Sequence, residues 1–279
     1  MRRGLVLGAL AFLTVVVVPN VDAAAAPAPA PPAAPTRAPQ KRASVAPQKY
    51  AQAVKSWHAP AAGKKPAHDE RGRPMLTLHA LNTGERLEVA ASGDAGSFTS
   101  RDLDRVAHLF RESSTGHEHP IEPRLLDLLY RIQRKFEAHE IRLVSGFRAG
   151  RGAPQKAPVR AAGSNHACGR AADIIVPGAR DEDVAKFARE LGFVGVGIYP
   201  TSGFVHVDVR GRSYFWVDSS GPGKRNRERG VLSDLAKKSD VRAIARGERP
   251  TAPFAISLEV ESSLEDRPEA EVPDEDDDV

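Results

Sequence analysis

The sequence predicts an α+β domain between residues 71 and 217, in which a small antiparallel sheet is flanked by helices. Three observations point to this class. Apolar and polar residues alternate with strand periodicity near both ends of the region, two amphipathic helical patterns follow the first strands, and one short helix interrupts the later strands. Strands and helices that are grouped in this way, rather than strictly alternating, are typical of α+β proteins.

The first elements are a hairpin and two helices. The stretch LTLHALNTGERLEV contains two alternating runs around residues 82–84, Asn-Thr-Gly, which predicts a β-hairpin. Thr99 or Ser100 is a suitable N-cap for the first helix. The second helix should begin near Glu122 with Pro123 in its first turn, followed by a stripe of leucines and isoleucine. These helices should cover one face of the sheet.

The later elements end in an unusual strand. Their predicted ranges are strands at 141–145 and 171–176, a helix at 181–191, and an antiparallel pair of strands at 194–199 and 204–209. The last of these reads FVHVDV, in which three valines alternate with Phe204, His206 and Asp208. Since successive side chains of a strand point to opposite faces, the valines should face the core. A histidine and a carboxylate together on the other face suggest a site.

The start of the chain predicts export. Arg2 and Arg3 precede an apolar run at 5–18, and Val-Asp-Ala at 21–23 suits cleavage, so residues 1–23 are interpreted as a secretory signal peptide. No later stretch approaches the roughly 20 apolar residues that a transmembrane helix needs. We therefore expect a protein without a transmembrane segment that acts in the periplasm or outside the cell. We also expect it to be a monomer.

The segments that flank the domain are compositionally biased. Residues 24–70 begin as an Ala/Pro-rich stretch that predicts a disordered tether, and residues 218–250 predict a basic loop and a peripheral helix. Residues 251–279 hold eleven acidic residues and one arginine, so that with a net charge of +4 for the whole chain the remaining residues carry +14. We expect this acidic tail to be disordered. A basic body attracts anionic polymers such as cell wall, but its charge alone names no partner.

The stretch SNHACGRAAD supplies polar residues that could join the face of His206. His166 and Asp173 lie seven residues apart with small residues between them. Zinc accepts imidazole nitrogen and carboxylate oxygen, and catalytic zinc sites commonly have three protein ligands. His166, Asp173 and His206 are therefore a candidate metal site. A lone histidine is more often a hydrogen-bonded structural residue, and Cys168 is an alternative thiolate ligand, so both interpretations stay open here.

The order of these motifs resembles a known family. Ser164-x-His166-x-x-Gly169-x-Ala171-x-Asp173, followed by the strand FVHVD, is similar to the zinc site of peptidase family M15. The stretches LNTGERLEV, VSGFR and GVGIYP further resemble its branch of murein endopeptidase K, long catalogued as a domain of unknown function. The resemblance extends from about residue 76 to 216 and leaves out the tether and the tail.

The resemblance implies both a fold and a function. It implies a hedgehog/D-Ala-D-Ala-peptidase-like domain in which His166, Asp173 and His206 hold zinc, and a zinc metallopeptidase that hydrolyses peptide cross-links of peptidoglycan. Arg148 would then bind a carboxylate of the peptidoglycan stem peptide, its partner, and no nucleic acid is expected. A D-Ala-D-Ala carboxypeptidase and a non-catalytic, zinc-stabilised cell-wall-binding module remain alternatives.

The chain departs from the pattern of the wider family at the catalytic base. Many of those peptidases carry an acid three residues before the last histidine ligand, where this chain has Gly203. Asp208 lies two residues beyond His206 and therefore about 7 Å away on the same strand face. It is the candidate catalytic base, although it could instead orient His206. The loop between Arg148 and Ser164 departs from the pattern too, which puts substrate preference in doubt.

Overall fold

The computed structural model describes residues 47–61, 63–93, 96–149, 164–221 and 226–251. These residues all belong to one unit, Val45–Val279. The predicted signal peptide, the tether before residue 47, most of the loop after Arg148 and the acidic tail after Thr251 lie outside the described residues.

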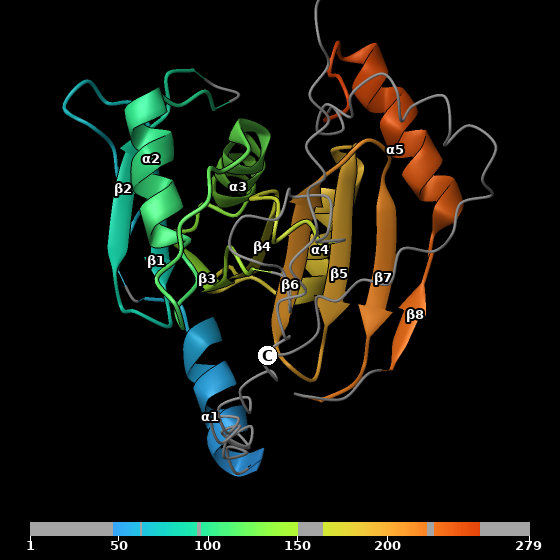
Figure 1. Ribbon diagram of the computed structural model, residues 1–279, viewed down its shortest axis with the longest axis horizontal. Helices are drawn as coiled ribbons and strands as arrows, with labels where there is room; N and C mark the ends of the chain where they lie inside the picture. Colours follow the sequence, from blue (N-terminus) through green and yellow to red (C-terminus); the bar gives the residue numbers. More distant parts are fainter. Residues whose placement is uncertain (1–46, 62, 94–95, 150–163, 222–225, 252–279) are drawn as a thin grey trace, which may run out of the picture. The chain divides into compact units, whose positions relative to one another are not determined.

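Eight strands form a single mixed sheet with the order β2-β1-β3-β4-β6-β5-β7-β8 (Figure 1). Their bounds are β1 Met75–Ala80, β2 Arg86–Ala90, β3 Ile141–Ser145, β4 Ala171–Ile175, β5 Val194–Tyr199, β6 Phe204–Val209, β7 Tyr214–Asp218 and β8 Arg227–Arg229. The pairs β1/β3 and β5/β7 are parallel, and the other neighbours are antiparallel.

The prediction of a small, antiparallel sheet is therefore wrong in size, and two of the pairings are parallel. Two strands were missed because their sequence signals are weak. The sequence of β7, YFWVD, does not alternate cleanly between apolar and polar residues, and β8 has only three residues, Arg-Glu-Arg. The β1/β3 pairing is parallel because two helices connect the first hairpin to β3, and parallel strands require such a crossover. The hairpin itself and the strands β3, β4, β5 and β6 lie within one residue of their predicted ranges.

Five helices accompany the sheet among the described residues: α1 Pro47–His58, α2 Ser100–Leu109, α3 Pro123–Lys135, α4 Asp181–Glu190 and α5 Ser233–Ala245. Thr99 is the N-cap of α2, where its hydroxyl accepts the backbone N–H of Asp102 at 3.2 Å. Pro123 occupies the first turn of α3, as predicted. None of these described helices combines the length and the apolar character that crossing a membrane requires.

The two faces of the sheet differ in what covers them. Apolar side chains from one face of the strands pack with residues of α2, α3, α4 and α5 in the main core. In β6, the three valines belong to this core, whereas Phe204, His206 and Asp208 belong to the opposite face. The predicted division of FVHVDV is thus confirmed, and the polar residues lie on the face away from the main core.

Helix α1 was not predicted, since residues 24–70 were expected to be a disordered tether. Its position is secured by tertiary contacts. Tyr50 Oη donates to the Ser202 carbonyl at 2.7 Å, and the guanidinium of Arg142 donates to the carbonyls of Trp57 at 2.6 Å and Ala59 at 3.3 Å. A single short helix is marginal in isolation. Contacts with residues 83 to 152 positions away, which composition does not reveal, therefore stabilise it.

His58, the last residue of α1, predicts a pH dependence. Its Nε2 lies 3.1 Å from Asp181 Oδ1. The hydrogen bond to Asp181 raises the pKa of His58, burial opposes this shift, and the carbonyl of Val54 and the charge of Arg142 act in opposite directions. A folded-state pKa above the unfolded value of about 6.5 stabilises the folded protein at pH values below about 6.5. This contribution to stability should be lost as the pH rises through the folded-state pKa.

His58→Gln should therefore lower the free energy of unfolding at pH 5.5, and the difference from wild type should shrink by pH 9. Urea unfolding at both pH values measures it. His117→Gln, at an exposed position, is the control and should show no such trend. A difference for His58→Gln that is equal at the two pH values would contradict this expectation.

Gly203 shapes the turn between β5 and β6. Its φ is +70°, a region in which a side chain strains the backbone, and a Cβ there would overlap Val54 of α1. An acid at this position would meet the same strain and the same contact, which accounts physically for the departure from the wider family.

Gly203→Ala should lower the free energy of unfolding by about 2–3 kcal/mol, of which about 1 kcal/mol is backbone strain and the rest is overpacking against α1. Gly84→Ala is the matched control, because Gly84 has a φ of +75° with nothing within 4 Å of a Cβ. Gly84→Ala should lower the free energy of unfolding only by the backbone strain. Urea denaturation measures both variants, and equal losses would show that contact with α1 does not destabilise Gly203→Ala.

Candidate metal centre

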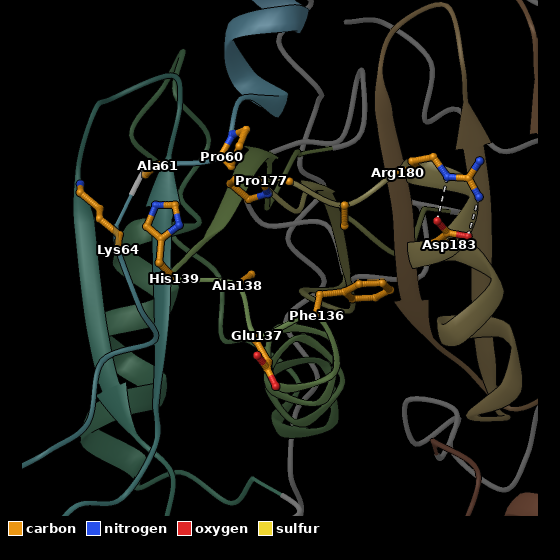
Figure 2. Close-up of a pocket in the computed structure, with 12 residues that line it drawn as sticks. Pro60, Ala61, Lys64, Phe136, Glu137, Ala138, His139, Pro177, Arg180 and Asp183 are labelled. Carbon is orange, nitrogen blue, oxygen red and sulfur yellow. Dashed lines mark hydrogen bonds and ion pairs between the residues drawn. The ribbon is translucent and has the colours of Figure 1, made fainter.

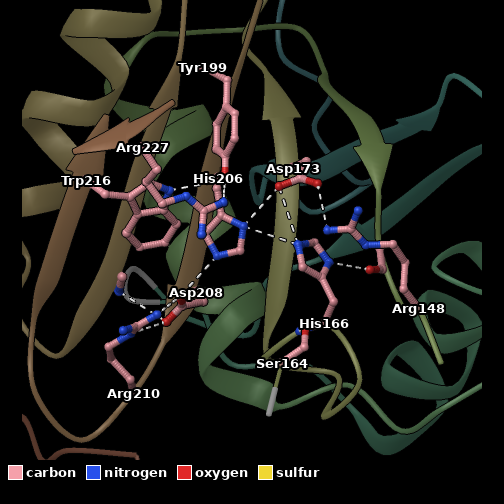
Figure 3. Close-up of polar contacts among 12 residues, drawn as sticks. Arg148, Ser164, His166, Asp173, Tyr199, His206, Asp208, Arg210, Trp216 and Arg227 are labelled. Carbon is pink, nitrogen blue, oxygen red and sulfur yellow. Dashed lines mark hydrogen bonds and ion pairs between the residues drawn. The ribbon is translucent and has the colours of Figure 1, made fainter. Parts of the chain in front are cut away.

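Three residues from separate segments meet on the face of the sheet opposite the main core (Figure 3). Asp173 on β4 pairs with His206 on β6, and His166 lies in the turn that precedes β4. The distances are 3.0 Å from His206 Nδ1 to Asp173 Oδ1, 3.2 Å from His166 Nε2 to His206 Nδ1 and 3.4 Å from His166 Nε2 to Asp173 Oδ1. All three side chains are buried.

The size of this triangle fits zinc. Zinc–nitrogen and zinc–oxygen bonds are about 2.1 Å long, and a tetrahedral site then separates neighbouring ligand atoms by about 3.4 Å. The three distances of 3.0 to 3.4 Å are close to that edge length. Among the described residues, this is the group whose ligand atoms could hold a metal ion, and Cys168 is not part of it.

The other ring nitrogens of both histidines are occupied. His166 Nδ1 donates to the Gly146 carbonyl at 2.6 Å, and His206 Nε2 donates to Asp208 Oδ2 at 3.0 Å. When both rings are neutral, these protons leave His166 Nε2 and His206 Nδ1 as the lone-pair nitrogens. Both face Asp173, so the tautomer that a metal requires is set by the second ring nitrogen of each histidine.

The site stabilises positive charge. Burial would raise the pKa of Asp173, but the charge of His166 and hydrogen bonds with both histidines outweigh it and hold the pKa well below its usual value. Burial lowers the pKa of His206, yet hydrogen bonds to Asp173 and Asp208 prevail and raise it to about 9. A buried position that favours a cation between carboxylates is suited to a divalent metal.

Asp208 lies on the side of the His206 ring away from the other two ligands (Figure 3). Its Oδ1 accepts the Gly195 N–H at 3.1 Å and the Arg210 Nε–H at 2.6 Å, and its Oδ2 accepts from His206 and from Arg210 Nη2. A carboxylate offers about four acceptor positions. All four are used, so the contacts of Asp208 favour the orienting role, which the sequence left open, over the role of a base.

Two glycines of β5 make room for this arrangement. Gly195 pairs with Asp208, and Gly197 pairs with both His206 and Trp216. A Cβ at Gly195 would overlap the Asp208 carboxylate, and one at Gly197 would overlap the indole of Trp216. The Trp216 ring packs 5.0 Å from the ring of His206. The two glycines thus let Asp208 and Trp216 pack against the strand that carries His206.

Arg148 follows β3 and points its guanidinium toward Asp173 (Figure 3). Its Nη2 lies 3.4 Å from Asp173 Oδ2, and 23% of its side chain is exposed. Within the part of the chain that the structure describes, its Nε has no hydrogen-bond partner. Because Nε is buried, an additional anionic group could reach Arg148 only at the exposed part of its side chain.

Sequence reasoning did not identify two residues that support the site. Arg210 holds Asp208, and Trp216 packs on His206. A signal for Arg210 was present, since it follows Asp208 by two residues and so continues the polar face of the strand. Trp216 offered no comparable signal, because its approach to His206 depends on the β5/β7 pairing.

A separate pocket of about 380 Å³ lies where the ends of α1 and α3 meet the start of α4 (Figure 2). None of its lining residues belongs to the metal-ligand cluster, and its Arg180 and Asp183 pair with each other. Its mixture of charges indicates no particular ligand.

This chain is similar to known peptidoglycan endopeptidases. The M15 peptidase family model described as peptidoglycan L,D-endopeptidase MepK matches residues 67–216. The peptidoglycan L,D-endopeptidase MepK of Escherichia coli (strain K12) is 32% identical over 146 residues, which cover 48% of this chain and 76% of the relative. The probable peptidoglycan L,D-endopeptidase MepK of Haemophilus influenzae is 34% identical over 140 residues, which cover 48% of this chain and 75% of the relative. No solved structure matches this chain. The chain therefore belongs to the M15 peptidase family of the peptidoglycan L,D-endopeptidase MepK.

Proposed function

We propose that this protein is an exported zinc metallopeptidase that hydrolyses peptide cross-links of peptidoglycan. The observation that carries the proposal is the triangle of His166, Asp173 and His206, whose ligand atoms lie 3.0 to 3.4 Å apart with the second nitrogen of each ring already bonded. Three protein ligands leave a position for reacting groups, as in catalytic zinc sites.

Two further observations support the substrate and the place of action. The relatives that align with this chain are named peptidoglycan endopeptidases, which favours an internal cross-link over a terminal D-alanine. The signal peptide predicted at residues 1–23 would bring the protein to the periplasm, where its polymer substrate lies.

The roles of the side chains follow from their contacts. When bound, zinc supplies Lewis-acid polarisation of the scissile carbonyl and activation of water at neutral pH. Arg148, whose partly exposed side chain lies beside Asp173, binds a carboxylate of the stem peptide and so positions the cross-link. Asp208 holds the His206 ring in the tautomer and orientation that expose Nδ1.

Digestion of purified cross-linked muropeptide dimers tests the proposal. The wild-type protein should convert dimers to two monomers, a chelator should stop the reaction, and added zinc should restore it. Release of free alanine with intact dimers would instead identify a carboxypeptidase. Binding of dimers without any turnover would identify a wall-binding module, and either result would refute an endopeptidase.

A further inference from the structure

Helix α1 packs on the same face of the sheet as the metal-ligand cluster. Its Trp57 contacts a small apolar cluster made of Ile175, Tyr199, Phe204 and Trp216. These four residues lie on β4, β5, β6 and β7 and face away from the main core. The helix therefore contributes an aromatic side chain to the surface beside the site.

Two residues of this apolar cluster are the next side chains along the same strand faces as Asp173 and His206. Ile175 follows Asp173 by two residues on β4, and Phe204 precedes His206 by two residues on β6. Alternate residues of a strand lie about 7 Å apart on one face. Because β4 and β6 are antiparallel with Asp173 opposite His206, Ile175 and Phe204 lie at the same end of the site. Trp57 packs over that end.

Part of this surface is accessible. Trp57 is only partly buried, and so are Leu81 and Val144, which pack on the same cluster. We refer to these three side chains as the Trp57 surface. It presents apolar groups next to the buried metal ligands, whereas Arg148 offers a charge beside Asp173. A substrate that lies across the site would thus meet an apolar surface as well as a cation.

The Trp57 surface is held in place from both ends of α1. Tyr50 Oη donates to the Ser202 carbonyl at 2.7 Å, Arg142 donates to the Trp57 carbonyl at 2.6 Å, and the Gly178 N–H donates to the His58 carbonyl at 3.0 Å. Because the Trp57 surface is ordered before binding, little conformational entropy is lost there when substrate binds. The helix precedes the region at 67–216 that matches the family model.

We infer that Trp57 is a specificity-determining residue that contacts the stem peptide beside the scissile bond. The inference rests on the proposed function. An extended peptide advances about 3.4 Å per residue. Ile175 and Phe204 lie about 7 Å along their strands from Asp173 and His206, and Trp57 packs on the cluster that contains them, so the Trp57 surface meets the second substrate residue from the reacting carbonyl. The occupant is an apolar part of the stem peptide, such as the methyl group of an alanine.

The experiment compares Trp57→Ala with Lys55→Ala in the full chain, since Lys55 is exposed on the same helix. Cleavage of a purified muropeptide dimer gives kcat and KM, and bound zinc is measured in parallel. Loss of roughly 60 Å² of apolar contact corresponds to a KM about tenfold higher. Trp57→Ala should show that rise with kcat within about threefold and with full zinc content, and Lys55→Ala should match wild type.

One further variant separates this role from a structural one. Trp57→Phe retains an aromatic ring and should keep KM within about threefold even if Trp57→Ala loosens α1. A wild-type KM in Trp57→Ala, or a loss of kcat and zinc without a change in KM, would overturn the inference.

A binding measurement separates failure of the inference from failure of the proposed function. The chain has two tryptophans, so adding dimer to chelator-treated protein should change the emission of wild type more than that of Trp57→Phe. If the protein cleaves no dimer, the proposed function fails while this contact is still tested. Equal emission changes in the two proteins would refute the contact.

Discussion

Replacing His166 by alanine should reduce bound zinc from about one ion per chain to less than about 0.1 and should lower muropeptide cleavage by about 1000-fold or more. In the proposed centre His166 supplies one of three ligand atoms, and its Nε2 is 3.2 and 3.4 Å from the other two. With two ligands left, the remaining site cannot hold zinc against water and protons. Metal analysis after dialysis and a timed dimer digest measure the two effects.

Folding has to be separated from metal loss in this variant, because His166 is fully buried. A ligand that binds only the folded state raises the melting temperature. Added zinc should therefore raise the Tm of wild type and leave that of His166→Ala unchanged. His117→Ala, at an exposed position before α3, should behave like wild type. Full zinc content or wild-type cleavage in His166→Ala would rule out the proposed centre.

Asp208→Asn should weaken zinc binding by about 10- to 100-fold and should leave kcat at saturating zinc within about tenfold of wild type. The amide keeps the shape of the side chain but loses the charge that accepts hydrogen bonds from His206 and Arg210. Loss of a group that orients a metal ligand typically has an effect of this size on metal affinity. Zinc titration against a competing chelator and kinetics at several zinc concentrations separate the two quantities.

The alternative role of Asp208 gives the opposite pattern. A general base contributes about 100- to 10,000-fold to the rate, so its loss would lower kcat while zinc affinity stayed normal. Asp183→Asn is the matched control, because Asp183 is a partly exposed aspartate that also pairs with an arginine. It should leave both quantities unchanged. A large fall in kcat at saturating zinc would restore Asp208 as the base.

The local elements of the domain were predictable from sequence because their signals are local. The Asn-Thr-Gly turn, the Thr99 cap and Pro123 in the first turn of α3 act within a few residues, and the hairpin, α2 and α3 form at these positions. Helix α1 and strand β8 carry weak local signals. Long-range partners such as Arg142 and β7 stabilise them, and a pattern in one segment cannot show such partners.

For the site, the sequence by itself determined which side chains would share a face, since strand periodicity puts His206 and Asp208 opposite the valines. It also indicated His166 and Asp173 as companions. Only the tertiary structure decided which contacts each group makes. The Gly146 carbonyl selects the tautomer of His166, and Arg210 with the Gly195 N–H fills the acceptor positions of Asp208. These contacts join different segments across the sheet, and their geometry exists only after the strands have paired.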